Sequence, residues 1–200
     1  MAEDDLVSLV TSRICHDLVS PIGAIDNGME LMSAISGIAH SAEMGLIGES
    51  ARAAGIKLRL FRIAFGTASG DAVSRGADLA EVFSASFSRG RTTFDWPDRP
   101  ASLPRQDAKL AALLLLCAEG AIPFGGKMSL TSSGDGTIRI DVTAERLRWK
   151  DALWNALTGA TAFADVQAGE VQFPLAALAA RHRARAVTAT HTEAGCTIAA

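Results

Sequence analysis

The residues best suited to chemistry in this chain are a histidine and the acid that follows it, His16 and Asp17. A neutral imidazole presents a nitrogen lone pair near physiological pH, which is what a nucleophile toward a phosphoryl group requires. A carboxylate beside it can bond the second ring nitrogen and so fix the tautomer that leaves the outer nitrogen free. The pair therefore predicts a catalytic site in which His16 is phosphorylated and Asp17 orients it.

Helical periodicity places His16 on the polar side of a long amphipathic helix. At about 100° per residue, apolar residues such as Ile14 and Leu18 fall on the opposite side. Arg13, one turn before His16, is predicted either to pair with a phosphoryl oxygen or to be solvated. His16 should face water. The residues predicted to contact a partner lie around it and are Leu9, as an exposed apolar contact, and Ser12, Arg13, Ser20, Gly23 and Asn27.

Pro21 supports the functional interpretation of this segment. A proline has no N–H, so the helical bond to the carbonyl of Asp17 is missing and the helix should bend there. A proline inside a helix lowers helix stability by about 3 kcal/mol, so its presence here favours a functional role for the segment. Without Pro21, an exposed histidine at a polar helix position is more often a solvated surface residue than a catalytic one.

Composition excludes several classes of function. The chain has 200 residues, 48% of them hydrophobic, and a net charge of −3, with basic residues scattered, so we expect no nucleic-acid partner. It has no apolar run long enough to span a membrane and no secretory pattern at its start, so we expect a cytoplasmic protein. Three cysteines, Cys15, Cys117 and Cys196, are too few and scattered for a disulfide framework or a zinc site. No histidine pair has metal-ligand spacing. We therefore predict no metal and no bound cofactor.

The first part of the chain, residues 1–70, is predicted to be a helical hairpin. One helix spans residues 4 to 35 and a second spans Ser41 to Phe65, and the short connection from Gly37 to His40 requires them to pack antiparallel. A hairpin has only two layers and leaves much of each apolar stripe uncovered. A second copy of the chain would cover them. We therefore expect a dimeric four-helix bundle.

The second part, residues 71–200, is predicted to be an α+β domain in which helices are segregated from a largely antiparallel sheet. A turn at Ser133 to Gly136 should join two of the strands, and a proline-bearing loop should span Trp96 to Pro104. The predicted helices are Ala77–Phe87, Gln106–Ala121, Trp149–Leu157 and Leu175–Arg185, and the predicted strands are Arg91–Asp95, Lys127–Ser132, Thr137–Thr143, Ala186–His191 and Cys196–Ala199.

Two segments carry a resemblance to a known family. Cys15 to Gly28 reads CHDLVSPIGAIDNG, and Leu60 to Gly66 reads LFRIAFG. With these segments the first 70 residues resemble the dimerisation and phosphotransfer domain of bacterial histidine kinases. The whole chain resembles the ChpT-type histidine phosphotransferases of alphaproteobacteria.

The second domain resembles the ATPase domain of those kinases in layout, but it lacks the nucleotide-binding residues. Leu113 and Cys117 stand where the kinases carry asparagines that contact nucleotide and magnesium, and neither side chain is a good magnesium ligand. Beyond the strand that ends near Val142, the chain continues from Thr143 to Arg148, where a kinase would show a glycine-rich adenine-binding box. The resemblance therefore implies an α/β sandwich related to a degenerate ATPase fold, which does not bind ATP. The last predicted hairpin, around Glu193 to Ile198, matches the ATPase fold.

The resemblance implies a relay. The chain would accept a phosphoryl group on His16 and pass it to an aspartate of a receiver domain. It would bind no cofactor, because the receiver supplies the acceptor aspartate and the Mg²⁺ ion. A hybrid histidine kinase's receiver domain would donate the group, and cell-cycle response regulators such as CtrA and CpdR would receive it.

Two other functions stay open at this point. The chain could be an atypical histidine kinase that phosphorylates itself from ATP, against which the missing glycine boxes argue. It could also be a dimeric adaptor or inhibitor that docks on a kinase or receiver without taking phosphate. In that case replacement of His16 would leave its activity intact.

Overall fold

The structure is a computed structural model, and it describes residues 3–33, 42–68, 72–132 and 136–200. Three features expected from the sequence lie outside the described residues. These are the connection from Gly37 to His40, the domain boundary near Asp71, and most of the turn at Ser133 to Gly136.

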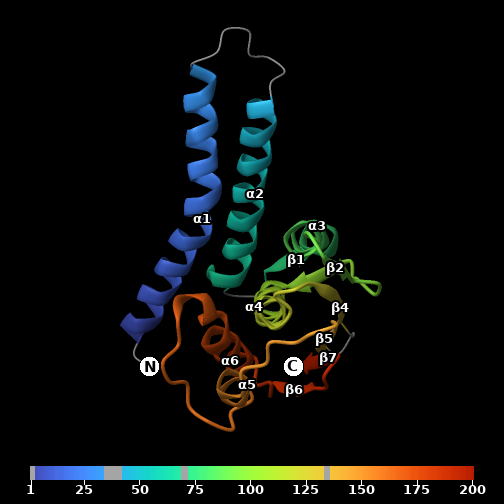
Figure 1. The fold of residues 1–200 in the computed structure, drawn as a ribbon. Helices are drawn as coiled ribbons and strands as arrows, with labels where there is room; N and C mark the ends of the chain where they lie inside the picture. The colour runs from blue at the N-terminus through green and yellow to red at the C-terminus, as the bar shows by residue number, and fades with distance from the viewer. Residues whose placement is uncertain (1–2, 34–41, 69–71, 133–135) are drawn as a thin grey trace.

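Two long helices form an antiparallel hairpin that extends away from the rest of the chain (Figure 1). Helix α1 is Glu3–Ser33 and helix α2 is Ala42–Phe65, so the predicted hairpin is confirmed and each described helix end lies close to its expected position. Pro21 lies inside α1, and the helix axis bends part-way along its length (Figure 1). The N-terminal half of α1 lies beside the C-terminal part of the chain and contacts the short 3₁₀ helix η1 (Ala168–Glu170).

The rest of the chain is built on a five-stranded sheet in the order β2-β4-β5-β7-β6. Its strands are β2 (Thr92–Asp95), β4 (Gly126–Ser132), β5 (Ile138–Thr143), β6 (Thr188–His191) and β7 (Gly195–Ala199). Only β2 and β4 pair in parallel, so the sheet is largely antiparallel, as expected. In β5, Ile138, Ile140 and Val142 are buried while their neighbours are not. This alternation shows that one face of the strand packs on the core.

Helix α4 (Arg105–Ala121) is the central helix of the domain. It contacts β5 of the sheet, helix α3 (Gly76–Phe87), helix α6 (Gln172–His182) and the base of α2. Consequently almost every side chain from Leu110 to Ala118 is buried. The short helix α5 (Asp151–Leu157) packs on α6. The mixed α+β fold is therefore confirmed.

Several predicted boundaries were wrong. Part of the expected loop at Trp96–Pro104 is a strand, β3 (Ser102–Pro104), which pairs with the unexpected strand β1 (Val73–Arg75). Strands of three residues are too short to show a periodic pattern. The last long helix was expected at Leu175–Arg185.

Helix α6 instead begins at Gln172, because a proline in the first turn of a helix, here Pro174, is tolerated. It ends at His182, and Ala184, two residues later, has a φ of 52° that no helix continues through. Helix α5 starts at Asp151 and not at Trp149, because Lys150 is extended. Among the described helices, none is both long and apolar enough to cross a membrane.

Candidate functional site

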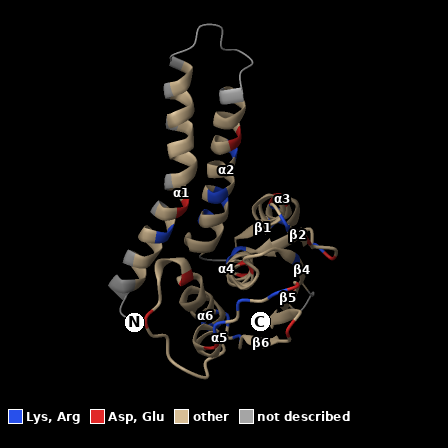
Figure 2. Ribbon diagram, in the orientation of Figure 1, with Lys and Arg blue, Asp and Glu red and all other residues tan. Residues whose placement is uncertain are grey.

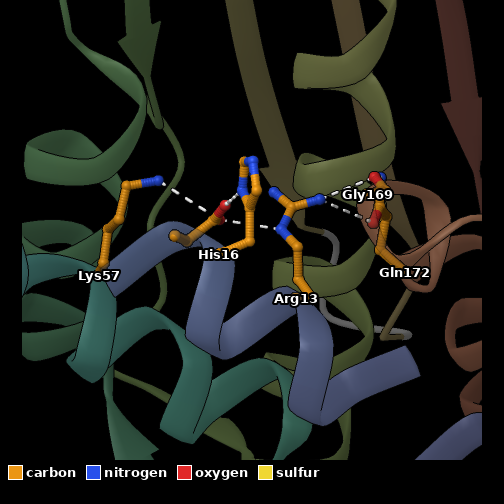
Figure 3. Close-up of polar contacts among 6 residues, drawn as sticks. Arg13, His16, Lys57, Gly169 and Gln172 are labelled. Atoms are coloured by element: carbon orange, nitrogen blue, oxygen red, sulfur yellow. Dashed lines mark hydrogen bonds and ion pairs between the residues drawn. The ribbon is translucent and has the colours of Figure 1, made fainter. Parts of the chain in front are cut away.

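His16 stands on the outer side of α1, close to the C-terminal domain (Figure 3). Its side chain is 85% exposed, which confirms that it faces water. Its Nδ1 atom lies 3.0 Å from Oδ1 of Asp17, so the contact expected between the ring and the carboxyl group is present. The outer atom, Nε2, is left for a partner molecule.

Asp17 has the opposite environment, since its side chain is only 9% exposed. Its Oδ2 atom lies 2.8 Å from Nε of Arg13 and 3.4 Å from Nζ of Lys57 on α2. Burial acts to raise the pKa of the Asp17 carboxyl group. The hydrogen bond from His16 and the charges of Arg13 and Lys57 act the other way and hold that pKa below its ordinary value. Asp17 is therefore a carboxylate at neutral pH.

The ionisation of Asp17 decides the tautomer of His16. A carboxylate carries no proton and can only accept hydrogen bonds. The proton between Asp17 and His16 must therefore sit on Nδ1 of the ring, and in the neutral imidazole this leaves the lone pair on Nε2. Nε2 is also the atom that points away from the carboxylate. The site thus holds a nucleophilic nitrogen in water with a fixed orientation.

Arg13 is not the solvated side chain that was one of the two expectations from the sequence. Its side chain is only 15% exposed, and besides Asp17 it reaches the C-terminal domain. Nη1 lies 2.7 Å from the carbonyl oxygen of Gly169 in η1 and 3.4 Å from Oε1 of Gln172 at the start of α6 (Figure 3). The guanidinium group therefore bridges the two parts of the chain.

The other residues predicted to contact a partner stay near the histidine. Ser12, Ser20 and Asn27 are exposed, while Leu9 and Gly23 are partly buried, so Leu9 is less accessible than expected. A Cβ atom added at Gly23 would meet nothing within 4 Å. This side of α1 is thus a shallow surface of small and polar residues beside His16.

Sequence reasoning missed three residues of this site: Lys57, Gly169 and Gln172. Each is far from His16 in sequence and carries no motif. Lys57 reaches Asp17 only because α2 packs antiparallel on α1, and the other two reach Arg13 only because η1, which directly precedes α6, lies against α1. Figure 2 shows positive and negative segments near one another on the hairpin close to the C-terminal domain.

The C-terminal part of this structure has a recognised family pattern. Residues 76–195, more than half of the chain, match the family model described as the histidine phosphotransferase C-terminal domain. The chain belongs to the histidine phosphotransferase family.

Individual members of this family agree with that result. Protein phosphotransferase ChpT of Brucella abortus (strain 2308) is 41% identical over 135 residues, which cover 66% of this chain and 63% of that protein. The match thus spans less than two thirds of the relative's length. A solved structure of a bacterial phosphotransferase is 33% identical, covers 100% of this chain and 97% of its own, and superposes with a TM-score of 0.83.

A more distant likeness concerns the fold alone. The histidine kinase domain of the Erythrobacter litoralis EL346 blue-light activated histidine kinase is 14% identical, with a TM-score of 0.50, over 90% of this chain and 92% of that one. This chain therefore shares the arrangement of hairpin and α+β domain with that histidine kinase domain.

The two positions that the resemblance matched to nucleotide-contacting asparagines of the kinases are buried in this chain. Leu113 and Cys117 are both fully buried within α4. Burial also raises the pKa of the Cys117 thiol well above its ordinary value, which keeps it protonated and a poor metal ligand. Within the described part of the chain, no group of three or more His, Cys, Asp or Glu residues is placed to hold a metal ion.

The lowered pKa of Asp17 predicts how the site responds to acid. A carboxyl group whose folded pKa lies below its ordinary value of 3.8 contributes stability above that value and loses it as the pH falls through the folded pKa. We expect the ¹³C resonance of the Asp17 carboxyl group to stay at its ionised position from about pH 8 to about pH 5 and to move only below about pH 4. Movement to the protonated position above about pH 5 would contradict the assigned tautomer of His16, because a protonated Asp17 could donate to Nδ1.

Proposed function

We propose that this protein relays a phosphoryl group between the aspartates of receiver domains, with His16 as the phosphorylated residue. The observation that carries the proposal is the pairing of an 85% exposed imidazole with a 9% exposed carboxylate on its Nδ1 atom. Nε2 then carries the nucleophilic lone pair and is also accessible to a partner. The membership of the chain in the histidine phosphotransferase family supports the same reaction class.

The chemical step needs only the residues of this site and a donor. Nε2 of neutral His16 attacks the phosphorus of an aspartyl phosphate, the new P–N bond forms, and the P–O bond to the donor aspartate breaks and leaves a carboxylate. The ring keeps its Nδ1 proton and becomes positively charged. Asp17, 3.0 Å away, neutralises that charge, while Arg13 and Lys57 balance the charge of Asp17 itself. Transfer onward is the reverse step toward a second receiver.

Partners and cofactors follow from this chemistry. Phosphoryl transfer depends on in-line positioning and on neutralisation of charge more than on covalent machinery. We propose that the receiver supplies the Mg²⁺ ion and the aspartate, and that this chain binds no ATP, in keeping with its buried Leu113 and Cys117. The resemblance to ChpT-type proteins suggests a hybrid kinase's receiver as donor and CtrA-like and CpdR-like regulators as acceptors.

The first prediction tests the relay directly. A receiver domain carrying ³²P on its aspartate should transfer label to the wild-type protein, and the label should be stable in base and labile in acid, as expected for phosphohistidine. His16→Ala should take no label above background, because the proposal places the phosphoryl group on Nε2 of His16 alone. Gel autoradiography after seconds to minutes measures both.

Other results would point to other functions. Equal labelling of His16→Ala would place the phosphoryl group elsewhere and overturn the proposal. If neither protein takes label although both bind a receiver, the chain is an adaptor or inhibitor. If the wild type takes label from ATP alone, it is a kinase. His182→Ala, on α6 and away from the site, is the matched control and should be labelled like the wild type.

We propose that the receiver docks on the surface around His16 made by Leu9, Ser12, Arg13, Ser20, Gly23 and Asn27. A Cβ at Gly23 meets nothing within 4 Å in this chain. An alanine at this helix position should stabilise the fold by about 0.5–1 kcal/mol. The same methyl group would meet a receiver packed against this side of α1.

Gly23→Ala should therefore be at least as stable as the wild type but slower in transfer. We expect an increase of several-fold in the receiver concentration that gives half-maximal rate, measured by labelling over a receiver titration. Gly45→Ala, on α2 and also with nothing within 4 Å of its added Cβ, should raise stability without changing transfer. Unchanged transfer by Gly23→Ala would mean that the receiver does not approach this part of the helix.

We further propose that residues 1–70 form one domain and dimerise as a four-helix bundle, and that residues 71–200 form the second. Exposed apolar side chains on both helices support the dimer. On α1, Ile22 is 49% and Met29 is 61% exposed, and on α2, Leu58 is 58% exposed. Ile22 and Met29 lie about 240° and about 220° round α1 from His16, so a contact between copies on that side of the helix leaves the histidine free.

Disruption of the proposed dimer contact at Met29 should separate the two copies. Met29→Glu places a charge in the proposed dimer contact and removes no buried side chain, so we expect a mass near that of one chain by light scattering at micromolar concentration, where the wild type has twice that mass. Asn27→Glu, exposed on the histidine side, should leave the dimer intact. A dimeric Met29→Glu protein would show that the contact lies elsewhere.

A further inference from the structure

We propose that Arg13 is a positioning residue that makes the orientation of His16 depend on the place of the C-terminal domain. The inference rests on the proposed function, since it concerns the same histidine. Arg13 acts through Asp17, to which its Nε atom is bonded at 2.8 Å. It connects the carboxylate that holds His16 to the segment formed by η1 and the start of α6, which we call the 168–172 segment.

The connection is a continuous series of hydrogen bonds. His16 Nδ1 donates to Oδ1 of Asp17 at 3.0 Å, and Oδ2 of the same carboxylate accepts from Nε of Arg13 at 2.8 Å. The other end of the guanidinium donates from Nη1 to the carbonyl oxygen of Gly169 at 2.7 Å. Only two side chains therefore separate the reacting ring from the backbone of the other domain (Figure 3).

An arginine is the residue that this bridge requires. Its planar fork presents several N–H donors in fixed directions, so one group can bond a carboxylate with one edge and a carbonyl with another. Since the Arg13 side chain is 15% exposed and Asp17 is 9% exposed, water competes little for either bond. A lysine at this position would retain the charge, but a single ammonium group would not hold both partners in the same geometry.

The 168–172 segment is itself held firmly. Glu170 accepts a hydrogen bond from the backbone N–H of Gln167 at 3.2 Å and forms an ion pair with Lys150, just before α5. Gln172 is 3% exposed and donates from Nε2 to the Gly169 carbonyl oxygen at 3.0 Å. That carbonyl therefore accepts from Gln172 and Arg13 together, and its position follows the C-terminal domain.

The electrostatic balance explains why the connection matters for His16. Two cations, Arg13 and Lys57, share Oδ2 of Asp17, which leaves Oδ1 turned to the imidazole. Lys57 is the weaker partner at 3.4 Å. If the 168–172 segment moves, Arg13 loses its second anchor, the carboxylate can rotate, and the Nδ1–H tautomer of His16 is no longer favoured to the same extent. Contact of a receiver with that segment would act on the histidine in this way.

The test combines the state of the ring with the rate of the reaction. In Arg13→Gln, two-dimensional ¹⁵N NMR of the histidine side chains should show a larger share of the Nε2–H tautomer of His16 than in the wild type. The maximal rate of phosphoryl acceptance at saturating receiver should fall about tenfold, which is comparable to the loss seen when an outer-shell partner that orients a metal ligand is mutated. Because Arg13 also belongs to the proposed docking surface, the tautomer and the maximal rate decide the test, and the half-saturating receiver concentration does not. Arg13→Lys should restore the tautomer in part. Arg52→Gln, an exposed arginine of α2, is the matched control and should change nothing.

A second variant distinguishes coupling from a local role. Glu170→Ala loosens the 168–172 segment without altering α1, and it should change the tautomer in the same direction as Arg13→Gln. Combined with Arg13→Gln, it should have no further effect, because the connection is already broken. Additive effects, or an unchanged His16 tautomer in a folded Arg13→Gln protein, would overturn the proposal. If Arg13→Gln does not fold, Glu170→Ala alone decides: a wild-type tautomer then excludes the coupling.

The two readouts separate this inference from the proposed function. The NMR measurement needs no phosphoryl donor and reports on the ring alone. If the wild type takes no label, the relay fails, but the shift of tautomer can still be seen. If the wild type takes label and the tautomer does not respond, the relay stands and the coupling fails.

Discussion

A buried negative charge organises this molecule. A carboxylate that is 9% exposed must be matched by donors and cations, because its removal from water would otherwise cost several kcal/mol. Asp17 obtains them from three directions: His16 on its own helix, Lys57 on α2, and Arg13, which brings the C-terminal domain with it. The Asp17 carboxylate therefore links three features of the molecule: the orientation of the histidine, the packing of the hairpin and the contact between the domains.

The contrast between His16 and Asp17 follows from this arrangement. Neighbours on a helix point about 100° apart, so one can face water while the next faces the interior. Because of that angle, the His16 side chain is 85% exposed while that of Asp17 is buried. Pro21 adds to this, since it removes the N–H that would bond the carbonyl of Asp17 and allows α1 to bend beside the C-terminal domain.

The C-terminal domain shares its arrangement with that of a histidine kinase domain, and its interior is apolar. Leu113 and Cys117 pack on the inner side of α4, and the helix serves as the centre of the core between sheet, α6 and α2. In the proposed relay, the domain holds Gly169 and Gln172 against Arg13, and so supports the histidine.

The sequence by itself determined the features that depend on local order. Periodicity predicted the long helices, the side of α1 on which His16 lies and its contact with Asp17, because each of these involves residues within a few turns of one helix. Short elements such as β1 and β3 and the start of α6 at Gln172 were missed, since three residues show no period and a proline in a first turn looks like a boundary. Only the tertiary structure decided that Arg13 bonds Gly169, that Lys57 joins Asp17 and that Leu9 is partly covered. These contacts join residues far apart in sequence, and their partners carry no local pattern because a backbone carbonyl is present at every position.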